Sequence, residues 1–187
     1  MRRTTHRRRR RRVPWMRPTE LRDCGAAAFA SVAWAAGHEV SVEEARDLVR
    51  TDNNGTHLAG LLHGGRTIGL KARAAISDFD GLRAIKGWAI VHLDPGAGHF
   101  VALLRWTRRG LWVMDPNRGR TFMRRADYER ESSHYVVEYR RSNPFLAVFE
   151  ATAEKYREEG YLGCLLGLWN KGQAITAMLD LAKHLLH

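Results

Sequence analysis

Residues 23–37 read DCGAAAFASVAWAAG, and this stretch decides how the rest of the sequence is interpreted. Asp23 is a typical N-cap residue and Gly37 a typical stop signal, with an alanine-rich apolar run between them. The pattern predicts a buried helix that starts at Cys24 and ends at Ala36. A thiol in the first turn of a helix lies beside partial positive charge, which lowers its pKa. Cys24 is therefore a candidate nucleophile, although a buried cysteine at a helix start can also be structural.

The elements that follow this helix change from helical to strand periodicity along the chain. Ser41 with Glu44 forms a capping box that opens a second helix to about Arg50. The segments 56–68 and 78–85 are expected to be helical, with a helical turn at 126–130. Strands are expected at 71–75, 88–93, 99–106, 111–115, 121–123 and 135–139. Helices first and antiparallel strands second indicate an α+β fold.

Two further residues with catalytic chemistry lie at the ends of neighbouring expected strands. His99 follows a glycine-containing turn and opens one strand, and Asp115 ends the next. A hairpin that joins these strands brings their outer ends together, so the two side chains can be neighbours. Taken alone, His99 can be a structural histidine and Asp115 a turn-forming aspartate. Together with Cys24 they indicate a thiolate that faces an imidazole oriented by a carboxylate.

Residues 23–140 resemble the bacterial cysteine peptidase domain that processes bacteriocin precursors in peptidase-containing ABC transporters. The matching stretches are Asp23–Ala27, Gly55-Thr56 with Leu58 and Gly60–Leu62, Gly69–Ala72, His99–Val101, and Asp115-Pro116 with Gly119. The resemblance implies a papain-like cysteine peptidase fold, with an N-terminal helical lobe followed by an antiparallel sheet lobe. It also implies roles: Cys24 attacks the carbonyl after a double-glycine leader, His99 is the base, and Asp115 orients it.

One position departs from the family pattern. The family carries a glutamine six residues before the cysteine, whose amide helps to stabilise the oxyanion, and here that position is Pro18. The candidate oxyanion donors are therefore the Thr19 hydroxyl and the Cys24 backbone N–H. Losing one such donor costs about 10²–10³ in rate. We expect a thiol peptidase that cleaves a leader from a small secreted peptide precursor, and the alternative is a weak or inactive module that only binds peptide.

The net charge of +11 is concentrated at the N-terminus. Eight arginines fall within Arg2–Arg12, and the remaining residues carry +3. Because such a run repels itself, residues 1–17 are expected to form a disordered arm. The arm could contact a polyanion or an anionic lipid. A further interpretation is a nucleic-acid-binding or membrane-tethered protein whose function depends on this arm. The rest of the sequence lacks a basic stripe with interleaved aromatic residues, which counts against this interpretation.

The remaining sequence features concern domains and partners. We expect a peptidase domain at 18–141 and a helical extension at 142–187, where apolar residues recur at helical spacing. No apolar run is long enough for a transmembrane helix, and no P-loop is present. The expected partners are a peptide precursor and a separate ABC transporter. The expected location is the cytoplasm, or a membrane through that transporter.

Cys24 and Cys164 predict neither a disulfide nor a zinc site, so no cofactor or metal is expected. Other thiol chemistry, such as acyl or amide transfer, stays open.

Overall fold

The structure is a computed structural model that describes residues 12–93 and 98–142. The chain divides into two units, residues 1–141 and 142–187, and the helices and strands named here belong to the first. The expected C-terminal helices and most of the arginine-rich arm lie outside the described residues. None of the helices in the described ranges is long and apolar enough to cross a membrane.

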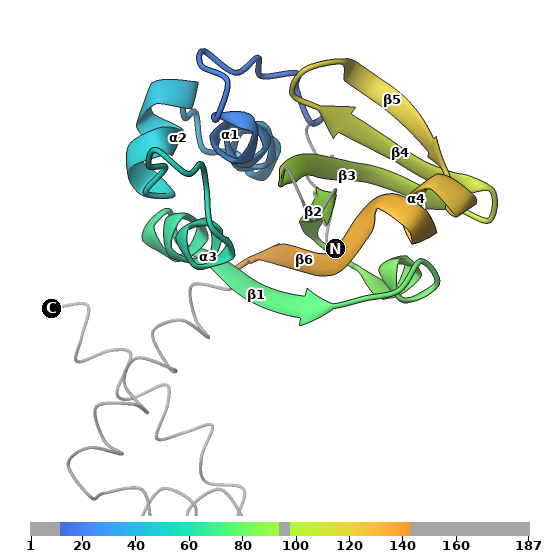
Figure 1. The fold of residues 1–187 in the computed structure, drawn as a ribbon. Coiled ribbons are helices and arrows are strands. Elements are labelled where there is room, and N and C mark those ends of the chain that lie inside the picture. The colour runs from blue at the N-terminus through green and yellow to red at the C-terminus, as the bar shows by residue number, and fades with distance from the viewer. Residues whose placement is uncertain (1–11, 94–97, 143–187) are drawn as a thin grey trace, which may run out of the picture. The chain divides into compact units, whose positions relative to one another are not determined.

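The first three helices of the domain form a layer on one side of the sheet (Figure 1). They are α1 (Cys24–Ala36), α2 (Val42–Leu48) and α3 (Leu58–Thr67). The expected start and end of α1 are confirmed: Gly37 adopts the left-handed conformation that ends the helix, with φ 104°. The capping box of α2 is also confirmed, because Ser41 and Glu44 exchange side chain and backbone hydrogen bonds of 3.1 and 2.8 Å.

A six-stranded antiparallel sheet follows, in the strand order β1-β6-β2-β3-β4-β5. Its strands are β1 (Leu70–Ile76), β2 (Trp88–Leu93), β3 (His99–Thr107), β4 (Gly110–Asp115), β5 (Gly119–Arg124) and β6 (Ser132–Arg141). Two short helices, η1 (Gly81–Ala84) and α4 (Arg125–Glu131), complete the domain. Every expected strand is confirmed, but the expected helix at 78–85 is a single 3-10 turn. The α+β, papain-like architecture predicted from the sequence is thus the one observed.

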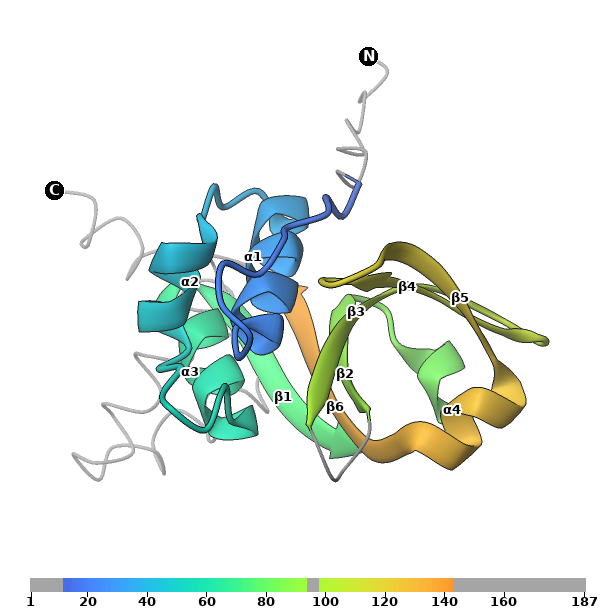
Figure 2. The ribbon, with the colours of Figure 1, turned by 45° about the horizontal axis from the view of Figure 1, so that its top comes forward.

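The sheet carries a hydrophobic core on each face. Figure 2 shows α1, α2 and α3 on one side of the sheet and α4 on the other. On one face, Phe29 of α1 packs with Phe100 of β3 and Tyr139 of β6, and the Tyr139 hydroxyl donates to the carbonyl of Leu61. On the other face, Val101 of β3 packs in a second core with side chains from η1 and α4. Because β3 is buried on both faces, the position of its first residue is firmly set.

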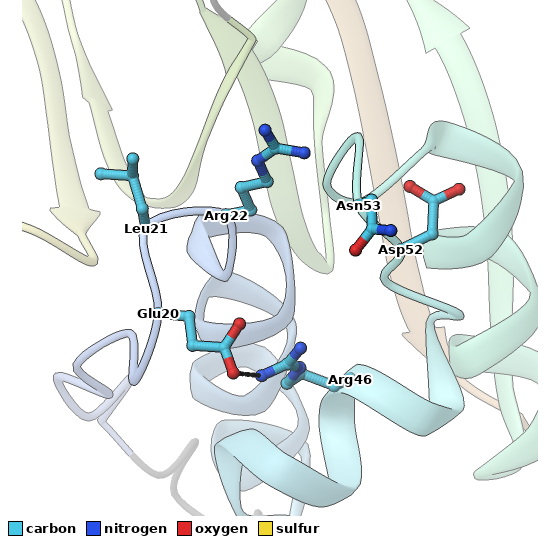
Figure 3. A pocket seen from close by; sticks show the side chains of 6 residues that line it. All are labelled: Glu20, Leu21, Arg22, Arg46, Asp52 and Asn53. Carbon is cyan, nitrogen blue, oxygen red and sulfur yellow. Dashed lines mark ion pairs between the residues drawn. The ribbon is translucent and has the colours of Figure 1, made fainter.

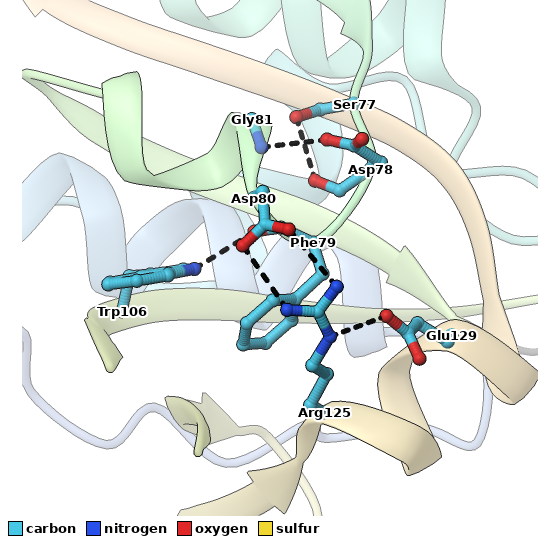
Figure 4. A network of polar contacts seen from close by, with 8 residues as sticks. All are labelled: Ser77, Asp78, Phe79, Asp80, Gly81, Trp106, Arg125 and Glu129. Carbon is cyan, nitrogen blue, oxygen red and sulfur yellow. Dashed lines mark hydrogen bonds and ion pairs between the residues drawn. The ribbon is translucent and has the colours of Figure 1, made fainter. Parts of the chain in front are cut away.

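Polar contacts tie η1 and α4 to the second face of the sheet (Figure 4). The Trp106 indole N–H donates to the carbonyl of Phe79 at 2.9 Å. Arg125 pairs with Asp80 at 3.0 Å and with Glu129 at 2.7 Å, and its guanidinium lies 4.9 Å from the centre of the Phe79 ring. Exposed ion pairs contribute little stability, so the burial of Phe79 is the main anchor of this segment.

The folded domain begins earlier than the sequence predicted. Val13 and Met16 pack against the core that contains α1, and the Met16 backbone N–H donates to the Ser31 hydroxyl at 3.4 Å. Val13 and Met16, which fall within the expected arm, therefore pack on the domain. Both are apolar side chains, which gain free energy by leaving water.

Candidate active site

Cys24, His99 and Asp115 come from three different elements and meet at one place. Cys24 is the first residue of α1, His99 the first of β3 and Asp115 the last of β4. The β3–β4 hairpin pairs Ala102 with Met114, which brings the start of one strand beside the end of the other. Because α1 packs on β3, the helix N-terminus lies at the same end of the sheet. The juxtaposition expected from the sequence is present.

Asp115 holds one nitrogen of the His99 ring. The Nε2 atom of His99 lies 3.1 Å from Oδ1 of Asp115, and the two side chains are only 24% and 12% exposed. The Asn117 backbone N–H donates to the same carboxylate oxygen at 2.8 Å. Burial raises the pKa of the Asp115 carboxyl, but these hydrogen bonds outweigh burial and hold the pKa below its ordinary value. The carboxylate is therefore charged and fixed in direction.

The other side of the His99 ring acts on Cys24. Since Asp115 occupies Nε2, Nδ1 is the ring nitrogen left to act on the thiol. The hydrogen bond that Asp115 accepts, followed by the interaction with Cys24, raises the pKa of His99 to about 9. Burial raises the pKa of the Cys24 thiol, but His99 and the Phe100 N–H lower it more, so the net pKa is below the ordinary 9.0. These shifts favour a thiolate–imidazolium pair.

The thiol has a weak partner while it is neutral. Its S–H group lies 3.9 Å from the carbonyl oxygen of Gly98, to which it can donate. That contact disappears on ionisation, because a thiolate has no hydrogen to donate. The sulfur then accepts from His99 and from the backbone N–H groups of Phe100 and Gly25. The surroundings of the sulfur therefore supply more donors to the thiolate than acceptors to the thiol.

Thr56, which the sequence analysis named only as part of a matching stretch, supports the position of Cys24. A Cβ on Gly25 would lie 2.4 Å from the Cβ of Thr56, a distance that real atoms do not reach. The Thr56 hydroxyl is in turn hydrogen-bonded to that of Thr51 at 2.7 Å. Gly25 is therefore needed for the 51–56 loop to close against the start of α1. This packing sets the position of the adjacent Cys24.

The loop before Cys24 differs from the expectation in one respect. Asp23 occupies the N-cap position, but its side chain makes no capping hydrogen bond to α1. It turns back instead and is fully buried, where Oδ2 accepts from the Thr19 hydroxyl at 2.7 Å and from the Glu20 N–H at 2.9 Å. Arg46 of α2 approaches its other oxygen at 3.4 Å and pairs with Glu20 at 2.6 Å. The single hydroxyl hydrogen of Thr19 is thus engaged with Asp23.

A hollow of about 450 Å³ opens beside this loop (Figure 3). None of the three converging side chains lines it, and its walls are mostly charged or polar. The lining residues are Glu20, Leu21, Arg22, Arg46, Asp52 and Asn53. Its position next to the residues that precede Cys24 makes it a neighbour of the site rather than the site itself. Within the described ranges, no cluster of three or more histidine, cysteine or acidic side chains could hold a metal ion.

Comparison with known proteins identifies the family of the chain. The sequence model of a protein family described as "Peptidase C39 family" matches residues 12–143 of the chain. The chain belongs to the peptidase C39 family. The resemblance inferred from the sequence is confirmed, and the matched range also includes the residues 13–16 that pack on the domain.

Two curated relatives in Escherichia coli are much longer than this C39 chain. The "Probable microcin-H47 secretion/processing ATP-binding protein MchF" is 31% identical over 138 residues, which cover 74% of the chain and 20% of that protein. The "Colicin V secretion/processing ATP-binding protein CvaB" is 31% identical over 128 residues, covering 68% and 18%. The chain thus spans about a fifth of the length of these relatives.

Solved structures confirm the fold of the C39 domain. A double glycine motif protease from an AMS/PCAT transporter, crystallised with the leader peptide, superposes with a TM-score of 0.65 at 23% identity, covering 73% of this chain and 96% of that one. The peptidase domain of Streptococcus ComA, a bifunctional ABC transporter, gives 0.62 at 22% identity, covering 68% and 97%.

Proposed function

We propose that this chain is a cysteine endopeptidase with Cys24 as nucleophile, His99 as general base and acid, and Asp115 as the residue that orients His99. The observation that carries the proposal is the 3.1 Å contact between Asp115 and Nε2 of His99, together with the Cys24 sulfur beside Gly98, the residue before His99. In this arrangement His99 lowers the pKa of the Cys24 thiol and Cys24 helps to raise that of His99. Family membership supports a peptidase. The proposed substrate class is a double-glycine leader on a small secreted peptide precursor, and it is supported by the likeness to a double glycine motif protease that binds a leader peptide.

The reaction follows from the protonation states of the pair. The Cys24 thiolate attacks the carbonyl carbon of the second glycine, a C–S bond forms, and the carbonyl π electrons move to oxygen. The intermediate collapses, the C–N bond breaks, and His99 gives its Nδ1 proton to the departing amine. Water then attacks the thioester while His99 takes its proton, and the thiolate leaves with the electrons of the C–S bond. Asp115 keeps the ring in the orientation that both transfers need.

The oxyanion donors are the weak part of this site. The Cys24 backbone N–H belongs to the first turn of α1, where N–H groups have no partner inside the helix, and it is our candidate donor. Thr19 is the other candidate from the sequence, but its hydroxyl hydrogen is directed at Asp23. To stabilise an oxyanion, Thr19 would first have to break that bond. We therefore propose the Cys24 N–H as the main donor.

The context of the enzyme is also a proposal. The E. coli relatives are secretion/processing ATP-binding proteins. By analogy, we propose that the chain acts in the cytoplasm on a precursor that a separate ABC transporter exports. Contact of the Arg2–Arg12 arm with a polyanion or an anionic membrane stays a prediction.

Mass spectrometry of a synthetic precursor tests the proposed activity. The substrate is a peptide whose leader ends in Gly-Gly, and the matched control peptide has valine in place of the second glycine. We expect the full chain to cleave only the first peptide, directly after the second glycine, and the Cys24→Ala variant to cleave neither. Cleavage of both peptides at equal rates would reject the proposed specificity, and cleavage by Cys24→Ala would reject the nucleophile.

One observation favours a second candidate function, a module that binds leader peptides without cleaving them. Pro18 stands where the family pattern has glutamine, and Thr19 is engaged elsewhere. The variant Pro18→Gln separates the two functions, because an oxyanion donor acts on the transition state more than on bound substrate. For a weakened peptidase, we expect kcat to rise by up to about 10²-fold with little change in affinity. Tight binding without cleavage by wild type and Pro18→Gln alike would identify the binding module.

A further inference from the structure

Trp15 connects the segment before the nucleophile to the turn after Asp115. Its indole N–H donates to the carbonyl oxygen of Pro116 at 2.8 Å. Its ring lies against Gly119, where a Cβ would come within 3.3–3.4 Å of three ring atoms. The Arg17 guanidinium lies 4.3 Å from the ring centre, and Trp15 as a whole is 41% exposed. Although Trp15 is partly exposed, its side chain is therefore held on this turn by one hydrogen bond and one ring contact.

The same segment is anchored to the helix that carries the nucleophile. Val13 and Met16, on either side of Trp15 in sequence, pack into the core of α1. The Met16 N–H donates to the Ser31 hydroxyl, which donates in turn to the carbonyl of Ala27, one turn after Cys24. Contacts therefore run without a break from α1, through residues 13–16, to the β4–β5 turn.

That turn determines where the Asp115 carboxylate points. Asp115 and Gly119 are paired at the base of the turn, and the Asn117 N–H holds Oδ1 of Asp115 from inside it. The Pro116 carbonyl and the Asn117 N–H belong to the same planar peptide group, so a hydrogen bond to this carbonyl also fixes the N–H that holds Oδ1 of Asp115. Trp15 provides the hydrogen bond that this carbonyl accepts. Gly119 has a φ of 76°, which favours glycine, and the ring covers the space that a side chain would take.

We propose that Trp15 is a positioning residue for the catalytic site: it clamps the 115–119 turn to the α1 side of the domain and so keeps Oδ1 of Asp115 on Nε2 of His99. The inference rests on the proposed function for its purpose, because the clamp matters for peptide cleavage only if the triad is catalytic. Its physical content does not depend on cleavage, since it concerns the orientation of one carboxylate.

His99 reports on this orientation without any substrate. The titratable groups that act on His99 are Asp115 from β4 and Cys24 from α1, and Asp115 is the stronger. Trp15 carries no charge, so its replacement can change the titration of His99 only by changing geometry or burial. A residue that merely added stability would leave this titration unchanged.

The test is an NMR titration of His99 in the full chain, with its signal assigned by its loss in His99→Gln. Trp15→Phe keeps a ring over Gly119 but removes the indole N–H, and Trp15→Ala removes both contacts. Arg17→Ala is the matched control, since it removes the guanidinium from the ring and leaves Pro116 untouched. We expect the His99 pKa to fall from about 9 toward 6.5, further in Trp15→Ala than in Trp15→Phe, and to stay in place in Arg17→Ala. We also expect kcat for leader cleavage to fall by about 10- to 10²-fold, with KM within about threefold, because a small displacement of a catalytic group has an effect of this size.

The outcomes separate this inference from the proposed function. Unchanged His99 titration in folded Trp15→Ala, or in Trp15→Phe if the alanine variant does not fold, overturns the positioning role. Slower cleavage with an unchanged titration also overturns it, because Trp15 would then act on the substrate or on stability. A wild type that cleaves no leader, but whose His99 titration responds to Trp15, rejects the peptidase and supports the clamp.

Discussion

Replacing Asp115 by asparagine tests the electrostatics of the site most directly. The hydrogen bond that Asp115 accepts is the largest cause of the raised His99 pKa, which is about 9 against an ordinary 6.5. That difference corresponds to about 3 kcal/mol in favour of the imidazolium, and the His99 side chain is buried enough to keep most of it. Asparagine has the same shape but no charge, so we expect most of this preference to be lost.

The expected loss of rate follows from the fraction of imidazolium. At pH 7.5, a histidine with a pKa of 9 is about 97% protonated, whereas one with a pKa of 6.5 is about 9% protonated. The active thiolate–imidazolium pair should therefore become about tenfold rarer in Asp115→Asn. In serine peptidases the equivalent change costs about 10⁴, because a neutral histidine then adopts the wrong tautomer. Here the active form of His99 is the imidazolium, which has hydrogens on both nitrogens, so in the protonated fraction of the variant the asparagine oxygen can still accept from Nε2. We therefore expect a loss of only about 10- to 10²-fold.

The assay is kcat/KM for leader cleavage as a function of pH, for wild type and Asp115→Asn. For wild type we expect a bell-shaped profile with an alkaline limb near 9, set by His99, and an acid limb below 9.0, set by Cys24. In the variant the alkaline limb should move toward 6.5. If the limb stays near 9 while the rate falls, then Asp115 acts in some way other than by raising the pKa of His99, and the electrostatic role assigned to it is refuted.

The same variant has a signature in stability. The raised His99 pKa contributes stability that is fully present below 6.5 and lost as the pH rises through about 9. The lowered Asp115 pKa contributes stability that is present above 3.8 and lost as the pH falls through its lower folded value. The difference in melting temperature between wild type and Asp115→Asn should therefore be largest between about pH 4 and 6.5 and should shrink above pH 9. A difference that grows toward alkaline pH would contradict the assigned charges.

The remaining predictions concern the thiol, its support and the arm. Cys24 should react with iodoacetamide much faster than Cys164, because a histidine and a helix N-terminus stabilise its thiolate, and equal rates in the folded chain would count against activation. Gly25→Ala should slow the labelling of Cys24 and the cleavage, and it should lower the melting temperature, since the new Cβ meets Thr56 at 2.4 Å. Adding Thr56→Gly should partly restore the rates and the melting temperature. No restoration would mean that the clash is not the cause. Deleting residues 1–12 should remove salt-dependent binding to DNA or anionic vesicles and change the stability by less than about 1 kcal/mol, whereas an unchanged salt slope would place the basic surface in the fold.

The parts of the fold that depend on local sequence were predictable. The bounds of α1 follow from Asp23, the alanine-rich run and Gly37, all of which act within one turn of the helix ends. The meeting of His99 with Asp115 followed from strand pairing alone, because a hairpin fixes which strand ends are adjacent. Both predictions required no knowledge of distant residues.

The parts that depend on distant contacts were not predictable. Asp23 has the right identity and position for an N-cap bond, but its carboxylate pairs with Arg46 of α2 and accepts from the Thr19 hydroxyl and the Glu20 N–H instead. Trp15 lies next to the arginine-rich run, so its local sequence predicts an arm, and only the folded structure places Pro116 within its reach. In each case a contact with a residue far away in sequence, Arg46 for Asp23 and Pro116 for Trp15, helps to fix the side chain.

These two residues lie on one segment, and together they separate two properties of the site. Residues 15–23 hold the start of α1 and the Asp115 turn in place through Trp15 and Asp23. The same segment has proline at the position where the family pattern has an oxyanion donor, and its nearest hydroxyl, that of Thr19, is part of the scaffold. The segment therefore supports the formation of the thiolate–imidazolium pair but adds little to the stabilisation of the oxyanion. Fast alkylation of Cys24 would thus establish the ion pair alone, and only the response of cleavage to Pro18→Gln measures how much transition-state stabilisation the site lacks.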